Sequence, residues 1–214
     1  MLIHTCCADC FLKLYQSLSE EMQAAVQIFF YNPNIYPREE HQARLLAIKK
    51  VVKSLNRDIK IIVANYQPQD YFQTIKKLKA NPENRDSSKN RGRQNRDAKN
   101  RENCENKSAD DRFTIISRQK RCPLCWELRL RALFEKAQAE KIPLVSSTLF
   151  SSNYQDLDKV KLIAQKLSEE YQIDFYVPKI DQAMRDHSHR GFYKQNYCGC
   201  LYSLLEKSRE KYDV

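Results

Sequence analysis

Cysteine is the residue type whose number and spacing most clearly predict chemistry in this chain. The sequence holds eight cysteines. In an intracellular protein, clustered thiols indicate metal binding or redox chemistry more often than a disulfide framework. Cys104 stands by itself in a polar segment and is expected to be a bystander. The other seven form three short groups: Cys6, Cys7 and Cys10; Cys122 and Cys125; Cys198 and Cys200.

The first group, TCCADC, predicts a site for a polynuclear metal cluster. Neighbouring side chains on an extended backbone point in different directions, so Cys6 and Cys7 are expected to be poor chelators of one tetrahedral zinc. Two adjacent thiolates can instead reach different corners of an iron–sulfur cluster. Burial behind a strand is the structural alternative, and it is weak for three thiols within five positions.

The second group, CPLC, places Cys122 and Cys125 at the start of a predicted helix. This spacing lets two thiolates approach one metal or cluster, and a helix N-terminus lowers the pKa of a thiol. By itself, the pattern is equally compatible with zinc, an iron–sulfur cluster or a redox dithiol. Together with Cys6 and Cys7, the pair could supply four thiolates from two loops to a cubane cluster.

The third group, YCGC, separates Cys198 from Cys200 by one glycine. A disulfide between them would close a small strained ring and would be easily reduced. Gly199 supplies the backbone freedom that such a ring needs. Zinc-binding loops can also use C-x-C, so the spacing leaves a redox pair and a ligand pair equally open.

The elements that must position these thiols alternate between short apolar runs and amphipathic stretches. This order predicts an α/β domain, in which a Rossmann-like parallel sheet has flanking helices. The first cysteines directly follow the first strand, so we expect them at the carboxyl edge of the sheet, where such folds bind ligands. The expected strands are 1–5, 26–32, 60–66, 143–148 and 173–178, and the expected helices are 9–23, 39–55, 70–80, 125–141 and 154–171.

A basic composition and one polar segment bear on possible partners. The formal net charge of +10 suits a polyanion such as nucleic acid, although a solvated basic surface is the simpler explanation. Residues 81–121 carry twelve Lys or Arg against seven Asp or Glu. We expect them to form a mobile insertion within one domain spanning residues 1–214, either as a plain linker or as a segment that touches RNA phosphates.

The same composition favours a cytoplasmic protein. No stretch approaches the roughly 20 apolar residues of a membrane span, and no signal-peptide core follows the N-terminus. We therefore expect no membrane partner.

Five motifs, in order, resemble those of the epoxyqueuosine reductases of the QueH family: LIHTCCADC, FFYNPNIYPREEHQAR, RCPLCWELRL, STLFSSNYQD and FYKQNYCGCLYS. The resemblance implies an oxidoreductase that reduces the epoxide of epoxyqueuosine at the wobble position of tRNA, in the last step of queuosine biosynthesis. It also implies a nucleotide-hydrolase-like variant of the Rossmann-like fold, a [4Fe-4S] cluster and an external electron donor. An additional iron is an open alternative.

Carried over residue by residue, the resemblance implies specific roles. The redox pair would be Cys198 and Cys200. The cluster ligands would be Cys6, Cys7, Cys122 and Cys125, with Cys10 as a further candidate. Three cations in or beside the motifs are candidates for substrate binding, with surface ion pairs as the alternative: Arg44, Arg129 and Lys194.

The chain also departs from the family pattern. Asp9 stands where proline is usual and could itself donate an oxygen ligand, and residues 179–197 fit the family loosely. Candidate proton donors near the thiols are Tyr197, Asp9 and His4, each more typical of a structural role. Two other functions remain open: a zinc-containing RNA-binding module, and a thiol oxidoreductase that uses CPLC.

Overall fold

A computed structural model describes residues 1–80 and 116–212. Its described part contains one sheet of five parallel strands in the order β3-β2-β1-β4-β5, which confirms the predicted α/β class and Rossmann-like sheet. The strands are β1 Leu2–His4, β2 Gln27–Phe30, β3 Ile61–Val63, β4 Leu144–Ser147 and β5 Asp174–Phe175. β1 lies at the centre of the sheet, so the loop that follows it leaves from the middle of the carboxyl edge.

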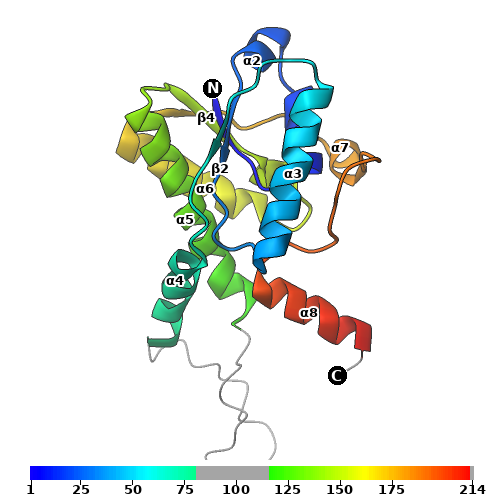
Figure 1. Cartoon of the computed structure of the whole chain (residues 1–214). Coiled ribbons are helices and arrows are strands. Elements are labelled where there is room, and N and C mark those ends of the chain that lie inside the picture. Colours follow the sequence, from blue (N-terminus) through cyan, green and yellow to red (C-terminus); the bar gives the residue numbers. More distant parts are fainter. Residues whose placement is uncertain (81–115, 213–214) are drawn as a thin grey trace, which may run out of the picture.

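Helices cover both faces of this sheet (Figure 1). α3 packs on one face with α1, and α5 and α6 pack on the other. The described helices are α1 Ala8–Gln16, α2 Glu20–Ala24, α3 Arg38–Ser54, α4 Pro68–Ala80, α5 Arg118–Ala139, the 3-10 turn η4 Thr148–Ser151, α6 Leu157–Tyr171, α7 Gln182–Asp186 and α8 Leu201–Tyr212.

Alternate residues of the strands feed two separate hydrophobic cores. Ile3 and Phe30 belong to the core under α1 and α3, whereas Leu2 and Phe29 belong to the core under α5 and α6. Successive strand side chains point to opposite faces, and both faces of a parallel sheet are buried. This double burial explains why the strand segments read as continuous apolar runs.

Three features differ from the expected elements. The first predicted helix is interrupted at residues 17–19, because Ser17 ends α1 and Ser19 caps a separate α2. α7 and α8 were not predicted. α5 begins at Arg118, so the last four residues of the predicted insertion are helical; residues 81–115 lie outside the described part.

The early start of α5 has a tertiary cause. The guanidinium of Arg121 is buried, donates to the backbone oxygen of Ile116 and forms an ion pair with Glu206 of α8, 2.6 Å away. This contact joins segments that are far apart in sequence. Among the described helices, none is both long and apolar enough to cross a membrane.

Candidate functional site

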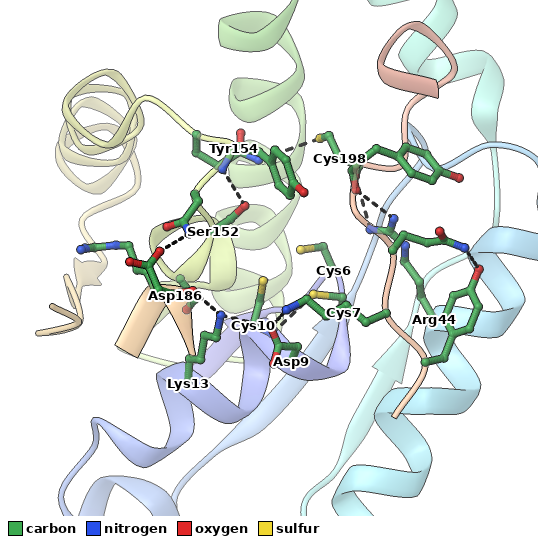
Figure 2. Close-up of a pocket in the computed structure, with 18 of the residues that line it drawn as sticks. Cys6, Cys7, Asp9, Cys10, Lys13, Arg44, Ser152, Tyr154, Asp186 and Cys198 are labelled. Atoms are coloured by element: carbon green, nitrogen blue, oxygen red, sulfur yellow. Dashed lines mark hydrogen bonds and ion pairs between the residues drawn. The ribbon is translucent and has the colours of Figure 1, made fainter. Parts of the chain in front are cut away.

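A cavity of about 180 Å³ lies at the carboxyl edge of the sheet (Figure 2). Its walls come from the loop after β1, the first turns of α1, the first half of α3, the middle of α5, the segment after η4, the end of α7 and the chain that precedes α8. Of the residues predicted to act in the site, it is lined by Cys6, Cys7, Cys10, Cys198, Arg44, Arg129 and Lys194. The first cysteine group therefore lies at the predicted edge.

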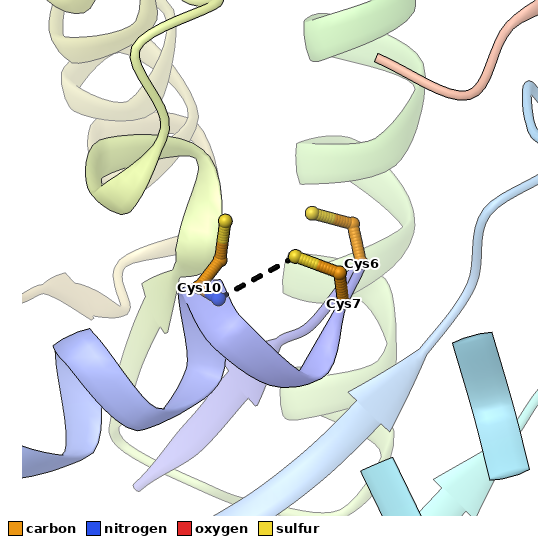
Figure 3. Close-up of side chains that lie close together, drawn as sticks. All are labelled: Cys6, Cys7 and Cys10. Atoms are coloured by element: carbon orange, nitrogen blue, oxygen red, sulfur yellow. Dashed lines mark hydrogen bonds between the residues drawn. The ribbon is translucent and has the colours of Figure 1, made fainter. Parts of the chain in front are cut away.

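The thiols of Cys6, Cys7 and Cys10 form a compact triad. Their sulfur atoms all lie within 4.8 Å of one another, and Figure 3 shows them pointing into the same space. Cys7 is the N-cap of α1, and its sulfur accepts the backbone N–H of Cys10 at 3.4 Å. The sulfur of Cys6 lies 3.4 Å from the hydroxyl of Thr148. Three thiols thus converge as metal ligands would.

The expectation that Cys6 and Cys7 must diverge is wrong. The strand ends at His4, and the chain bends at Cys6 before α1 begins at Ala8, so the two residues do not share one extended segment. The first turn of α1 then brings Cys10 back toward them. Side-chain direction therefore does not exclude a single metal ion at this triad.

The triad holds a mixture of thiolate and thiol. Hydrogen bonds from Cys10 and Cys7 hold the pKa of Cys6 well below its ordinary value. The hydrogen bond to Cys6 raises the pKa of Cys10 well above its ordinary value. A hydrogen bond from Cys10 lowers the pKa of Cys7. The hydrogen bond between Cys7 and Cys6, together with burial, outweighs this effect and raises the pKa of Cys7 to about 12. A metal bound by all three sulfurs would release the remaining protons.

Cys122 and Cys125 lie beside this triad, not within it. Cys125 is buried against Tyr71 and Cys200. Burial raises the pKa of Cys122, and it raises the pKa of Cys125 to about 12. The expectation that a helix N-terminus lowers these pKa values is wrong, because α5 begins at Arg118 and the desolvation of the thiols outweighs the helix dipole.

Cys198 and Cys200 are both free thiols, so the disulfide expected between them is not formed in this structure. A hydrogen bond from Cys200 lowers the pKa of Cys198 to about 6; burial opposes this shift, and Arg129 and Arg44 support it. The same hydrogen bond raises the pKa of Cys200 well above its ordinary value. At neutral pH the pair is therefore one thiolate and one thiol.

Arg44 holds the loop that carries Cys198. Its buried guanidinium pairs with Glu40 at 2.5 Å and donates to the backbone oxygens of Cys198 at 3.3 Å and Tyr197 at 3.4 Å. Gly199 adopts φ +99°, and a Cβ there would lie 2.8 Å from Nη2 of Arg44. Arg44 was predicted to bind substrate, but its donor nitrogens bond to other groups of the same chain.

Arg129 is a second buried arginine at the cavity, and it is almost without partners. It is 2% exposed, and its Nε donates to the backbone oxygen of Cys125 at 3.3 Å. Its Nη2 has no hydrogen-bond partner. Burial opposes its charge, but electrostatic interaction with Cys125, Cys198, Cys6 and Cys122 raises the pKa of Arg129 above its ordinary value. This cation therefore connects all three cysteine groups electrostatically.

Lys194 joins a cluster of charges around Asp9. The buried Asp9 carboxylate lies 3.1 Å from the ammonium groups of both Lys194 and Lys13, and it accepts the backbone N–H of His189 at 2.9 Å. Burial opposes ionisation, but these contacts lower the pKa of Asp9 to about 2. Asp9 thus holds no proton to donate at neutral pH, and it ties residues 188–194 to α1.

His4 lies buried beneath the triad. Its Nε2 lies 3.1 Å from the backbone oxygen of Tyr31, and its Nδ1 lies 3.0 Å from the hydroxyl of Ser147. Burial, and then the charge of Arg129, lower the pKa of His4 to about 4. The ring is neutral at pH 7 with both nitrogens engaged, so its role is to hold β1, β2 and β4 together.

Gln155 is a cavity residue that sequence reasoning missed. Its Oε1 accepts the indole N–H of Trp126 at 2.6 Å, and its Nε2 lies 3.9 Å from the sulfur of Cys198. The signal was present in the motif STLFSSNYQD, which contains Gln155 as its second-last residue. Nothing in the spacing showed that this segment would face Cys198, more than 40 residues away.

Comparison with known proteins identifies a family that matches the chain over most of its length. The family described as epoxyqueuosine reductase QueH matches residues 1–93 and 98–206. A Dehalococcoides mccartyi protein of that name is 26% identical over 97% of this chain and 93% of its own length. The Thermotoga maritima protein is 25% identical over 99% of this chain and 93% of its own. The Haemophilus influenzae protein is also 25% identical, over 98% of this chain and 73% of its own. Because the family match covers nearly the whole sequence, the chain belongs to the QueH family of epoxyqueuosine reductases.

Proposed function

We propose that this chain reduces epoxyqueuosine in tRNA to queuosine, in the cytoplasm, with electrons from an external donor. The observation that carries the proposal is the cavity in which the thiol triad faces Cys198 across the carboxyl edge of the sheet. Proteins of the family carry the name of this reaction. Converting the epoxide to an alkene consumes two electrons and two protons and releases water.

The donor set fits a thiolate-ligated iron–sulfur cluster. Cys6, Cys7 and Cys10 converge as three sulfur ligands. Cys122 and Cys125, which like Cys6 interact with the charge of Arg129, are the candidates to complete the set. We propose a [4Fe-4S] cluster here, which when bound would supply electrons singly.

Cys198 and Cys200 can hold both reducing equivalents that the epoxide needs. Oxidation of the Cys198 thiolate and the Cys200 thiol to a disulfide would release two electrons and one proton, and solvent would supply the second proton that the epoxide oxygen takes up. The thiolate of Cys198 faces the cavity, and the thiol of Cys200 keeps a proton. The external donor would then restore the dithiol.

The walls of the cavity offer groups suited to an RNA base. Tyr154 and Tyr193 are about two-fifths exposed, and with Tyr197 they line the cavity. Aromatic side chains stack on unpaired bases, and enzymes that modify a base turn it out of its stack. Lys194 and Arg185, at the same cavity, could contact the phosphates of the anticodon loop.

The direct test is expression of the chain in a strain that lacks its own epoxyqueuosine reductase. We expect queuosine to replace epoxyqueuosine among the tRNA nucleosides separated by liquid chromatography and mass spectrometry. The control is the same strain with an empty vector. Persistence of epoxyqueuosine, while the purified chain is folded and metallated, would contradict the proposal.

Iron analysis of two variants separates the ligand and redox roles. After anaerobic purification, Cys10→Ser should lose iron, whereas Cys198→Ser should keep the iron of the wild type and lose reductase activity. A brown wild-type protein with several irons per chain supports the cluster. A colourless protein with one zinc would instead support a zinc module at the triad, and loss of iron from Cys198→Ser would make that residue a ligand.

A further inference from the structure

Arg129 is a buried cation that has no carboxylate partner among the described residues. Its Nη2 makes no hydrogen bond, even to a sulfur atom. Among the ion pairs of the described residues, none includes Arg129, although the other buried arginines, Arg44 and Arg121, pair with Glu40 and Glu206. An unpaired buried charge is costly, because the group has lost its hydration without compensation. Attraction to the thiolates of Cys6 and Cys198 offsets part of this cost, but neither sulfur accepts from Nη2. The position of Nη2 therefore indicates a further negatively charged acceptor that the described residues do not provide.

The surroundings of Arg129 narrow the chemistry of that anion. Arg129 lines the same cavity as Cys6 and Cys198, and cysteines from all three groups interact with its charge. A phosphate of the RNA backbone is a poor candidate, since Arg129 is only 2% exposed. A negatively charged set of sulfur atoms, bound where these cysteines meet, would lie inside the cavity. It would accept the hydrogen bond that Nη2 of Arg129 can donate.

Arg44 does not compete for this role. Its three donor nitrogens already contact the Glu40 carboxylate and two backbone oxygens of the loop that carries Cys198. Arg129 donates to a backbone oxygen through Nε, and among the described residues its Nη2 has no acceptor. Of the two arginines at the cavity, Arg129 is therefore the one with a donor to spare.

We propose that Nη2 of Arg129 donates to a sulfur of the thiolate-ligated iron–sulfur cluster and that its charge raises the reduction potential of that cluster. The inference rests on the proposed function in so far as it needs the cluster. On reduction, a cluster held by thiolates gains one further negative charge. A nearby buried cation therefore stabilises the reduced cluster more than the oxidised cluster. Arg129 is thus a positioning and tuning residue, distinct from the ligands.

The test compares reduction potentials of the wild type, Arg129→Met, Arg129→Lys and Arg131→Met. Arg131 lies on the same helix, but it is one-third exposed and pairs with Glu127 and Glu170, so its variant is a matched control. Each full-length protein is purified anaerobically and reconstituted with ferrous iron and sulfide. Iron and sulfide are counted, folding is checked by thermal melting, and the midpoint potential is titrated by electron paramagnetic resonance.

We expect Arg129→Met to reduce the equilibrium constant for cluster reduction by about tenfold, which is ~59 mV for a one-electron couple. Arg129→Lys should keep most of the wild-type potential, and Arg131→Met all of it. Loss of iron from folded Arg129→Met, but not from Arg129→Lys, would also support the role of the charge.

Equal potentials in Arg129→Met and Arg131→Met would overturn the inference. Loss of iron from both Arg129 variants at an unchanged melting temperature would overturn it too, because the charge would then not be the decisive property. If the wild type does not assemble a cluster, Nη2 of Arg129 has no cluster sulfur to donate to, and the inference is overturned. The reductase function is judged separately, since analysis of tRNA nucleosides does not depend on the state of Arg129.

Discussion

Substitution of Gly199 by alanine tests whether Arg44 fixes the loop between the two C-terminal cysteines. Gly199 has φ +99°, and an added Cβ would lie 2.8 Å from Nη2 and 2.9 Å from Cζ of Arg44. The guanidinium cannot easily withdraw, because it is buried and bonded to Glu40 and to the carbonyl of Cys198. The methyl group would therefore strain the backbone and collide with Arg44.

These two effects can be given magnitudes. An L-residue at positive φ costs about 1–2 kcal/mol relative to glycine. Overpacking of a tight site costs a further ~1–3 kcal/mol. We therefore expect Gly199→Ala to lower the free energy of unfolding by about 2–5 kcal/mol. Gly191 also has a positive φ, +88°, but its Cβ would meet no atom within 4 Å; Gly191→Ala should cost only the ~1–2 kcal/mol of backbone strain.

The assay is urea unfolding of the reduced, metal-free protein, followed by circular dichroism. Removing the Arg44 guanidinium should remove the collision, so in an Arg44→Met background Gly199→Ala should cost no more than Gly191→Ala. The coupling energy of this double-mutant cycle should be about 1–3 kcal/mol. Equal destabilisation by Gly199→Ala and Gly191→Ala, or a coupling energy near zero, would refute the argument that Arg44 and Gly199 are packed against each other.

Two further predictions follow from charges at the cavity. Asp9→Asn should lower the free energy of unfolding at pH 7 by roughly 2 kcal/mol, because contacts with Lys13, Lys194 and His189 lower the pKa of Asp9 from 3.8 to about 2. This contribution is fully present above pH 4 and is lost as the pH falls through about 2. The urea midpoints of wild type and variant should therefore approach each other in acid. A gap between the midpoints that stays constant with pH would contradict the stabilising role of the Asp9 carboxylate. In the reduced, metal-free protein, alkylation of Cys198 by iodoacetamide should reach half its maximal rate near pH 6, as measured by peptide mass spectrometry. A midpoint at the ordinary thiol value of about 8.5 would show that Cys198 is not stabilised as a thiolate.

The sequence predicted the scaffold well because its signals are local. Short apolar runs such as 26–32 favour strands buried on both faces, and the amphipathic stretches between them favour helices that cover those faces. The break between α1 and α2 was missed, because two serine caps interrupt a pattern that otherwise continues the helix. α8 was missed, although its first turn follows Cys200 directly.

The site was predictable in its residue types and less so in their grouping. Spacing drew attention to the three cysteine groups, and the carboxyl-edge rule placed the first of them. Neither the spacing nor this rule showed that Cys10 converges with Cys6 and Cys7, because that convergence depends on where the strand ends and the helix starts. The raised pKa values of Cys122 and Cys125 come from burial, which a local motif does not reveal.

By itself, the sequence determined the parallel α/β sheet, the edge at which the first cysteines lie, and the motifs by which the family is recognised. These follow from periodicity and from residues that are adjacent along the chain. The pair of Arg44 with Glu40 is local, four residues apart on α3. Only the tertiary structure decided that Arg44 also binds the C-terminal loop and that Arg129 is left with a free donor among thiols. The physical reason is that burial and charge pairing depend on segments more than 100 residues apart meeting in one cavity.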